Sequence, residues 1–93
     1  MEKVFRRDYG VFCCPHVFSG ERPVLFVVRD PDGYWQFFCG QNDEDYSKGH
    51  HIGIGHLLER DPTLESMAEL KTSTVARRVS VGANWKISNL EVE

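Results

Sequence analysis

The chain has 93 residues, of which 41% are hydrophobic, 12% aromatic and 27% charged. This length and composition fit one compact domain, residues 1–93, and exclude a two-domain architecture. Eleven Lys and Arg residues against fourteen Asp and Glu residues give a net charge of −3, without the basic excess that nucleic-acid backbones select. We therefore expect no nucleic-acid partner.

The sequence also indicates a cellular compartment. No apolar run approaches the roughly 18–20 residues that a membrane-spanning helix needs, and the start of the chain lacks the apolar stretch of a signal peptide. Three cysteines, of which Cys13 and Cys14 are adjacent, are an odd set for a disulfide framework and suit a reducing environment. We expect a cytoplasmic protein without a membrane partner.

The first half of the chain predicts strands. Residues 4–5 and 11–14 are short apolar stretches, the second of which ends at Pro15, and they predict one or two short strands. Residues 24–28 and 34–39 predict a β-hairpin, because the Asp-Pro-Asp-Gly sequence at 30–33 is typical of a type I turn.

The register of this hairpin predicts two apolar faces. Alternation places one set of side chains on one face and a second set on the other: Leu25, Val27, Trp35, Phe37 and Cys39, and then Phe26, Val28, Tyr34, Gln36 and Phe38. Both sets are largely apolar, so each face requires a cover from the same chain or from a partner.

The second half predicts one main helix between short strands. Residues 50–54 are extended, and residues 57–60 form a single helical turn. Asp61 caps a helix that begins at Pro62 and packs through Leu64, Met67 and Ala68. Strands follow at residues 72–81 and 85–88, separated by a Gly-Ala-Asn turn. The fold class is therefore α+β, with a mixed or antiparallel sheet of about five strands and one main helix packed on it.

Cysteines and histidines are the residues with potential for metal or thiol chemistry. Cys14 and His16 form one compact pair and Cys39 stands alone, whereas structural zinc sites usually show two paired ligand elements. No sequence feature joins a cysteine to a catalytic base. We interpret the cysteines as small buried hydrophobic residues, and the sequence leaves open whether Cys14, His16, Cys39 and the other histidines meet in a metal site.

An acidic loop offers carboxylates but no regular ligand pattern. Asp43, Glu44 and Asp45, with His50 and His51, lack the alternate spacing around a glycine that oxygen-rich metal loops show, and we interpret them as a solvated loop. We assign no catalytic, cofactor-binding or metal-binding residue and expect no cofactor.

The aromatic content and the doubly apolar hairpin favour a protein that acts by contact over an enzyme. The predicted contact surface combines one hairpin face with the acidic loop: Phe26, Val28, Tyr34, Phe38, Asp43, Glu44, Asp45 and Tyr46. From this surface we expect either a protein partner or self-association. The alternative is a small metal-dependent or thiol hydrolase, marked by a cleft that gathers Cys or His with acids.

Four segments, in their order along the chain, carry a resemblance: residues 34–40, the acidic stretch that ends at Tyr46, residues 52–54, and residues 60–64 with Asp61-Pro62. Over about three-quarters of the chain this pattern resembles a bacterial domain-of-unknown-function family that includes proposed immunity proteins of polymorphic toxin systems. Cys39, Gln41-Asn42 and the histidine pair depart from the family pattern. The resemblance implies a small α+β domain without assigned catalytic residues that neutralises a toxin by covering it.

Overall fold

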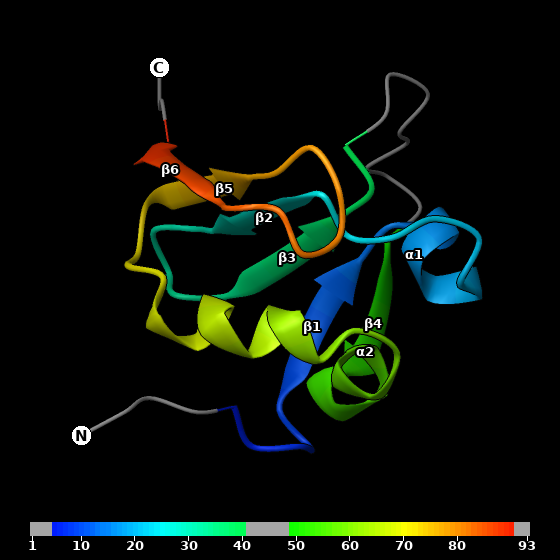
Figure 1. Cartoon of the computed structure of the whole chain (residues 1–93). Helices are drawn as coiled ribbons and strands as arrows, with labels where there is room; N and C mark the ends of the chain where they lie inside the picture. Colours follow the sequence, from blue (N-terminus) through cyan, green and yellow to red (C-terminus); the bar gives the residue numbers. More distant parts are fainter. Residues whose placement is uncertain (1–4, 41–48, 91–93) are drawn as a thin grey trace.

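A computed structural model of the chain describes residues 5–40 and 49–90. Within them, six strands form one mixed sheet in the order β4-β1-β3-β2-β5-β6, accompanied by three short helical segments (Figure 1). The strands are β1 (Gly10–Cys13), β2 (Phe26–Arg29), β3 (Trp35–Phe38), β4 (His50–Gly53), β5 (Thr74–Arg77) and β6 (Lys86–Asn89). The helical segments are α1 (Pro15–Ser19), α2 (Ile54–Arg60) and the 3-10 helix η2 (Pro62–Glu69).

The predicted hairpin is confirmed and lies at the centre of the sheet. β2 and β3 pair antiparallel, with Val27 opposite Phe37 and Phe26 opposite Phe38. Their turn closes through a hydrogen bond from the Gly33 amide to the Asp30 carbonyl, 2.9 Å long, and Gly33 has a φ of 95°. This left-handed conformation favours glycine, which explains why the Asp-Pro-Asp-Gly sequence correctly predicted a turn at residues 30–33.

The sheet is mixed because β1 runs parallel to β3 while the other pairs are antiparallel. Its six strands correct the expected number of about five. The additional strand is β4, which pairs with β1 along its whole length and is therefore an edge strand of the sheet rather than an isolated extended piece.

The expectation of one main helix was wrong. The segment that begins at Pro62 is a 3-10 helix of eight residues, although Asp61 caps it as predicted by accepting a hydrogen bond from the Thr63 amide at 3.1 Å. α2 already begins at Ile54, so the predicted single turn is a longer helix. α1 was not predicted: Pro15 was expected only to end a strand, whereas proline also suits the first position of a helix.

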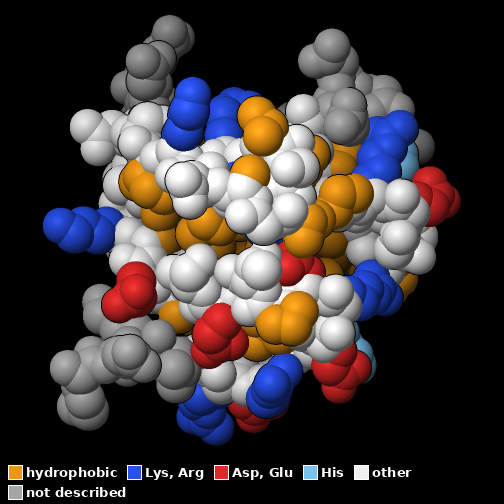
Figure 2. All heavy atoms as spheres, viewed as in Figure 1, with side chains coloured by type: hydrophobic (Ala, Val, Ile, Leu, Met, Phe, Trp, Pro, Cys, Tyr) orange, Lys and Arg blue, Asp and Glu red, His pale blue; other side chains and the backbone are white. Residues whose placement is uncertain are grey.

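The core lies on the face of the sheet that carries Val27 and Phe37. Both side chains are fully buried, and η2 crosses this face with Leu64, Met67 and Ala68 buried, as predicted. The indole Nε1 of Trp35, on the same face, donates a 2.8 Å hydrogen bond to the Met67 carbonyl. Figure 2 shows hydrophobic side chains across the middle of this view of the molecule.

We call the opposite side of the sheet the outer face. Strand pairing places on it, in β1, β2 and β3, a mainly aromatic and aliphatic set of residues: Phe12, Phe26, Val28, Gln36 and Phe38. Arg77 is paired with Phe26 across β5, and its guanidinium lies 4.0 Å from the Phe26 ring centroid.

A buried ion pair joins the start of η2 to the end of β5. Nη2 of Arg78 lies 2.5 Å from Oδ2 of Asp61, and the Arg78 side chain is completely removed from solvent. The same guanidinium donates to the Val24 carbonyl at 2.9 and 3.0 Å and to Thr63 Oγ1 at 2.8 Å. One arginine therefore holds η2, β5 and the segment before β2 together.

Candidate functional site

Cys14, His16 and Cys39 meet at one end of the sheet. Their potential ligand atoms all lie within 4.8 Å of one another, and Sγ of Cys39 is 3.8 Å from Nδ1 of His16. The structure therefore brings these three side chains together, which the sequence left open. His50, His51 and His56, which the structure also describes, are not part of the group.

The parallel pairing of β1 with β3 positions the two thiols. Cys13 is the register partner of Phe37, and the Cys14 amide donates a 3.2 Å hydrogen bond to the Phe37 carbonyl. Parallel strands end at the same edge of a sheet, so Cys14 and Cys39 each follow directly on a strand end and lie close together. Pro15 then starts α1, which turns back over this edge.

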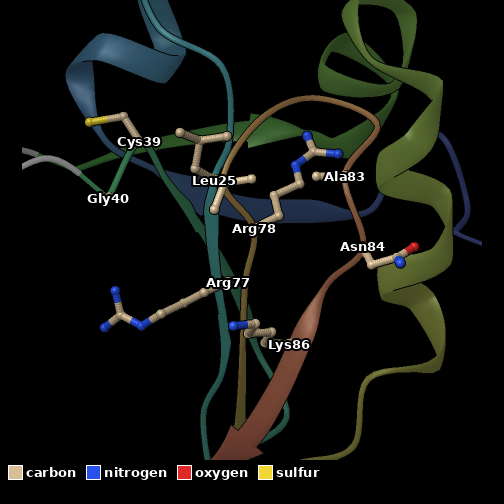
Figure 3. Close-up of a pocket in the computed structure, with 9 residues that line it drawn as sticks. Leu25, Cys39, Gly40, Arg77, Arg78, Ala83, Asn84 and Lys86 are labelled. Atoms are coloured by element: carbon tan, nitrogen blue, oxygen red, sulfur yellow. The ribbon is translucent and has the colours of Figure 1, made fainter.

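His16 closes the group from α1, and the cluster spans the boundary between core and surface. The side chains of Cys14 and Cys39 are buried, with exposures of 0% and 1%, whereas His16 is half-buried. In Figure 3 the Cys39 side chain extends from the end of its strand toward α1. His16 is the member of the group that reaches the surface.

Arg22 supplies a positive charge beside the cluster. Its Nη1 lies 3.5 Å from Nδ1 of His16 and donates to Sγ of Cys39 at 3.7 Å. Because a guanidinium is only a donor, this contact uses the His16 tautomer that carries its lone pair on Nδ1. The lone pairs of His16 Nδ1 and Cys39 Sγ therefore both point toward the Arg22 guanidinium.

Cys13 differs from this group. Its side chain lies on the core face, where burial raises the pKa of its thiol to about 11, partly offset by the positive charge of Arg60. The thiol of Cys13 is therefore fully protonated at neutral pH and unreactive, as the sequence interpretation expected of all three cysteines.

The predicted contact surface lies partly within the described residues. Tyr34 is 57% exposed and Phe26 is half-buried, whereas Val28 and Phe38 are buried. Asp43, Glu44, Asp45 and Tyr46 lie outside the described residues. The role of this surface in binding stays a prediction.

Two exposed phenylalanines that the sequence analysis did not select each pair with a histidine of β4. Phe12 is 41% exposed and meets His51 edge-to-face with ring centroids 3.9 Å apart, while Phe18 is 40% exposed and stacks on His50 at 4.1 Å. In a strand, side chains alternate between the two faces of the sheet, so residues 11–13 could have identified Phe12 as outward-facing. The pairing with His51 and His50 could not be predicted, because these histidines come from a distant part of the chain.

A cavity of about 400 Å³ lies beside β5, between Leu25, Cys39, Gly40 and the segment that leads to β6. Figure 3 shows the side chains of Arg77, at the end of β5, and Arg78, directly after it, extending in different directions. Arg78 is already paired with Asp61, so Arg77 and Lys86 are the accessible cations of this cavity.

Comparison of the chain with protein-family models, curated proteins and solved structures finds no match. In the part of the chain that the structure describes, there is no helix with the length and apolar character required to span a membrane.

Proposed function

We propose that this is a non-enzymatic bacterial protein that acts by protein–protein contact, in the manner of an immunity protein that covers a toxin. The observation that supports the proposal is the outer face of the sheet. Phe12 there is 41% exposed, while η2 and its buried side chains pack on the opposite face.

The chemistry of the outer face suits a protein partner. Aromatic residues and arginine are enriched in the centres of protein interfaces, where they supply most of the binding energy. Phe12 with its His51 partner and Phe26 with Arg77 stacked on it are two such groups on one face. A partner that brings carboxylates and apolar side chains would bury both groups.

The test compares lysine substitutions on and off the outer face. Phe12→Lys and Phe26→Lys place a charge where a partner would have to bury it, and both should abolish binding while the fold is retained. Val79→Lys is the matched control, because Val79 is 86% exposed in the segment after β5. Phe38 is a poorer position, since it is only 5% exposed and a lysine there should destabilise the domain.

The assay begins with capture from a lysate of the native host, followed by titration of the purified protein with any captured toxin encoded by a neighbouring gene. Sizing of the protein alone measures self-association. If both outer-face variants bind as the wild type does, while circular dichroism shows them folded, the proposed surface is wrong.

The alternative function, a small metal-dependent or thiol hydrolase, has the Cys14, His16 and Cys39 cluster in its favour. It predicts hydrolysis of activated ester or amide substrates that disappears in His16→Gln, with or without added Zn²⁺. Partner binding that survives His16→Gln, without measurable hydrolysis by the wild type, decides for the contact function.

A further inference from the structure

We propose that Cys14, His16 and Cys39 bind one Zn²⁺ ion. The proposal goes beyond the contact function and does not depend on it, because it rests on the geometry and chemistry of three side chains that gather where β1 and β3 end.

The distances between the donor atoms fit zinc. Zinc–sulfur bonds of about 2.3 Å and zinc–nitrogen bonds of about 2.0–2.1 Å, at tetrahedral angles, place neighbouring donors about 3.5–3.8 Å apart. The Sγ of Cys39 and the Nδ1 of His16 are 3.8 Å apart, and no pair in the group exceeds 4.8 Å. Side-chain rotations that move the donors by about 1 Å therefore complete the coordination.

The donor set selects the metal. Two thiolates and one imidazole suit zinc, whereas calcium and magnesium require oxygen ligands. On binding, each thiol gives up its proton to solvent, and two thiolates with Zn²⁺ form a neutral group. A neutral group can remain at the buried positions of Cys14 and Cys39, where an isolated ion could not. Three protein donors leave a fourth coordination position, which water fills in zinc sites of this kind.

The fold holds the donors in place without the ion. The hydrogen bond from the Cys14 amide to the Phe37 carbonyl fixes one thiol against β3, and Cys39 follows the same strand. His16 lies in the first turn of α1, directly after Pro15, whose ring limits the backbone. Zinc would therefore tether α1 to the end of β3 at little conformational cost.

Arg22 gives the proposal a specific signature. Its guanidinium nitrogen, 3.5 Å from His16 and 3.7 Å from Cys39, occupies the region toward which both lone pairs point. A divalent ion there is repelled by the guanidinium, which must move aside for the ion to bind. Removing this charge with Arg22→Gln should strengthen metal binding several-fold, an effect opposite to that of losing a ligand.

The experiment titrates the reduced full-length protein with Co²⁺ alone, followed by displacement with Zn²⁺. We expect one equivalent of Co²⁺ to produce thiolate-to-cobalt charge-transfer absorption and the intense visible bands of tetrahedral cobalt, both removed by Zn²⁺. Cys39→Ser and His16→Gln should each weaken binding by more than about tenfold. Cys13→Ala and His51→Gln are matched controls that should leave the affinity unchanged, because neither residue belongs to the group.

Circular dichroism in the presence of a chelator establishes that each variant is folded, and the half-buried His16 makes His16→Gln the safest ligand variant. Folded wild-type protein that gives no thiolate-to-cobalt band would overturn the proposal. So would unchanged affinity in both ligand variants, weaker binding in Arg22→Gln, or a disulfide between Cys14 and Cys39 in protein freshly purified under argon.

Discussion

Replacing Asp61 by alanine tests the ion pair that joins η2 to β5. The substitution removes the acceptor of the Thr63 amide and hydroxyl and the counter-ion of Arg78. The Asp61 carboxylate accepts from the Thr63 amide at 3.1 Å, a helix cap for which alanine replacement costs about 1 kcal/mol. It is also the counter-ion of Arg78, whose side chain is completely buried.

The second loss is the larger one. Removing one member of a buried ion pair leaves an uncompensated charge and costs about 3–5 kcal/mol. Arg78 keeps its hydrogen bonds to the Val24 carbonyl and its contact with the Trp85 ring, 4.3 Å from the ring centroid, so the lower half of that range applies. We expect Asp61→Ala to lower the free energy of unfolding by about 4–5 kcal/mol, the lost counter-ion and the lost cap together, well above the value of the cap alone.

Urea titration followed by circular dichroism measures this change, with an unchanged slope required for a two-state comparison. Asp61→Asn is the matched control, because it retains a capping oxygen and removes only the charge, and it should be less destabilising than alanine by about 1 kcal/mol. A loss of about 1 kcal/mol or less for Asp61→Ala would refute the argument, since it would show that Arg78 needs no counter-ion.

The same pair predicts how stability depends on pH. Burial by itself raises the pKa of Asp61, but hydrogen bonds from Thr63 and Arg78, together with the positive charge of Arg78, bring the pKa below its ordinary value of 3.8. A carboxyl whose pKa is lower in the folded state stabilises the protein above its unfolded pKa and loses that effect as the pH falls through the folded value. The wild type should therefore lose stability below about pH 4 more steeply than Asp61→Asn does.

Three further substitutions or reactions test single contacts of the core. Gly55→Ala should lower the free energy of unfolding, measured by urea titration, by about 1–3 kcal/mol, because a Cβ at residue 55 would lie 2.9 Å from the Arg7 carbonyl oxygen. A neutral result would mean that the backbone at Arg7 moves freely away from Gly55. Trp35→Phe should cost about 1–3 kcal/mol, because the Met67 carbonyl loses its indole donor, and an unchanged urea midpoint would argue against that bond. Cys13, with a thiol pKa of about 11, should react with iodoacetamide at pH 8 only as fast as the protein unfolds, so mass spectrometry that finds rapid labelling there would contradict its burial.

The parts of the fold that the sequence predicted are those with local causes. The hairpin depends on a turn sequence between two β-branched and aromatic runs, and the cap of η2 depends on Asp61 beside Pro62. The helical type of η2 could not be predicted, because its apolar spacing at Leu64, Met67 and Ala68 suits an α-helix equally well. The start of α1 could not be predicted, because a proline such as Pro15 can end a strand or start a helix.

The thiol and imidazole cluster could not be predicted because it depends on a non-local pairing. Cys14 and Cys39 lie close together only because β1 runs parallel to β3, and local sequence does not specify which distant strand is the neighbour. Arg22 reaches the cluster from a third segment that has no metal-binding signature of its own. Once the sheet order is known, Cys14-Pro15-His16 after one strand and Cys39 after its parallel neighbour become a recognisable pattern.

The order of the strands has a consequence for how the protein is made. Both neighbours of β1 in the sheet, β3 and β4, follow it in the chain, so β1 leaves the ribosome before either partner exists. The hairpin of β2 and β3 can form as soon as residue 38 emerges. β1, which is already synthesised, can then pair with β3, and β5 pairs later with β2. A nascent chain arrested before β3 would expose Phe12 on an unpaired strand, a template for association with other chains.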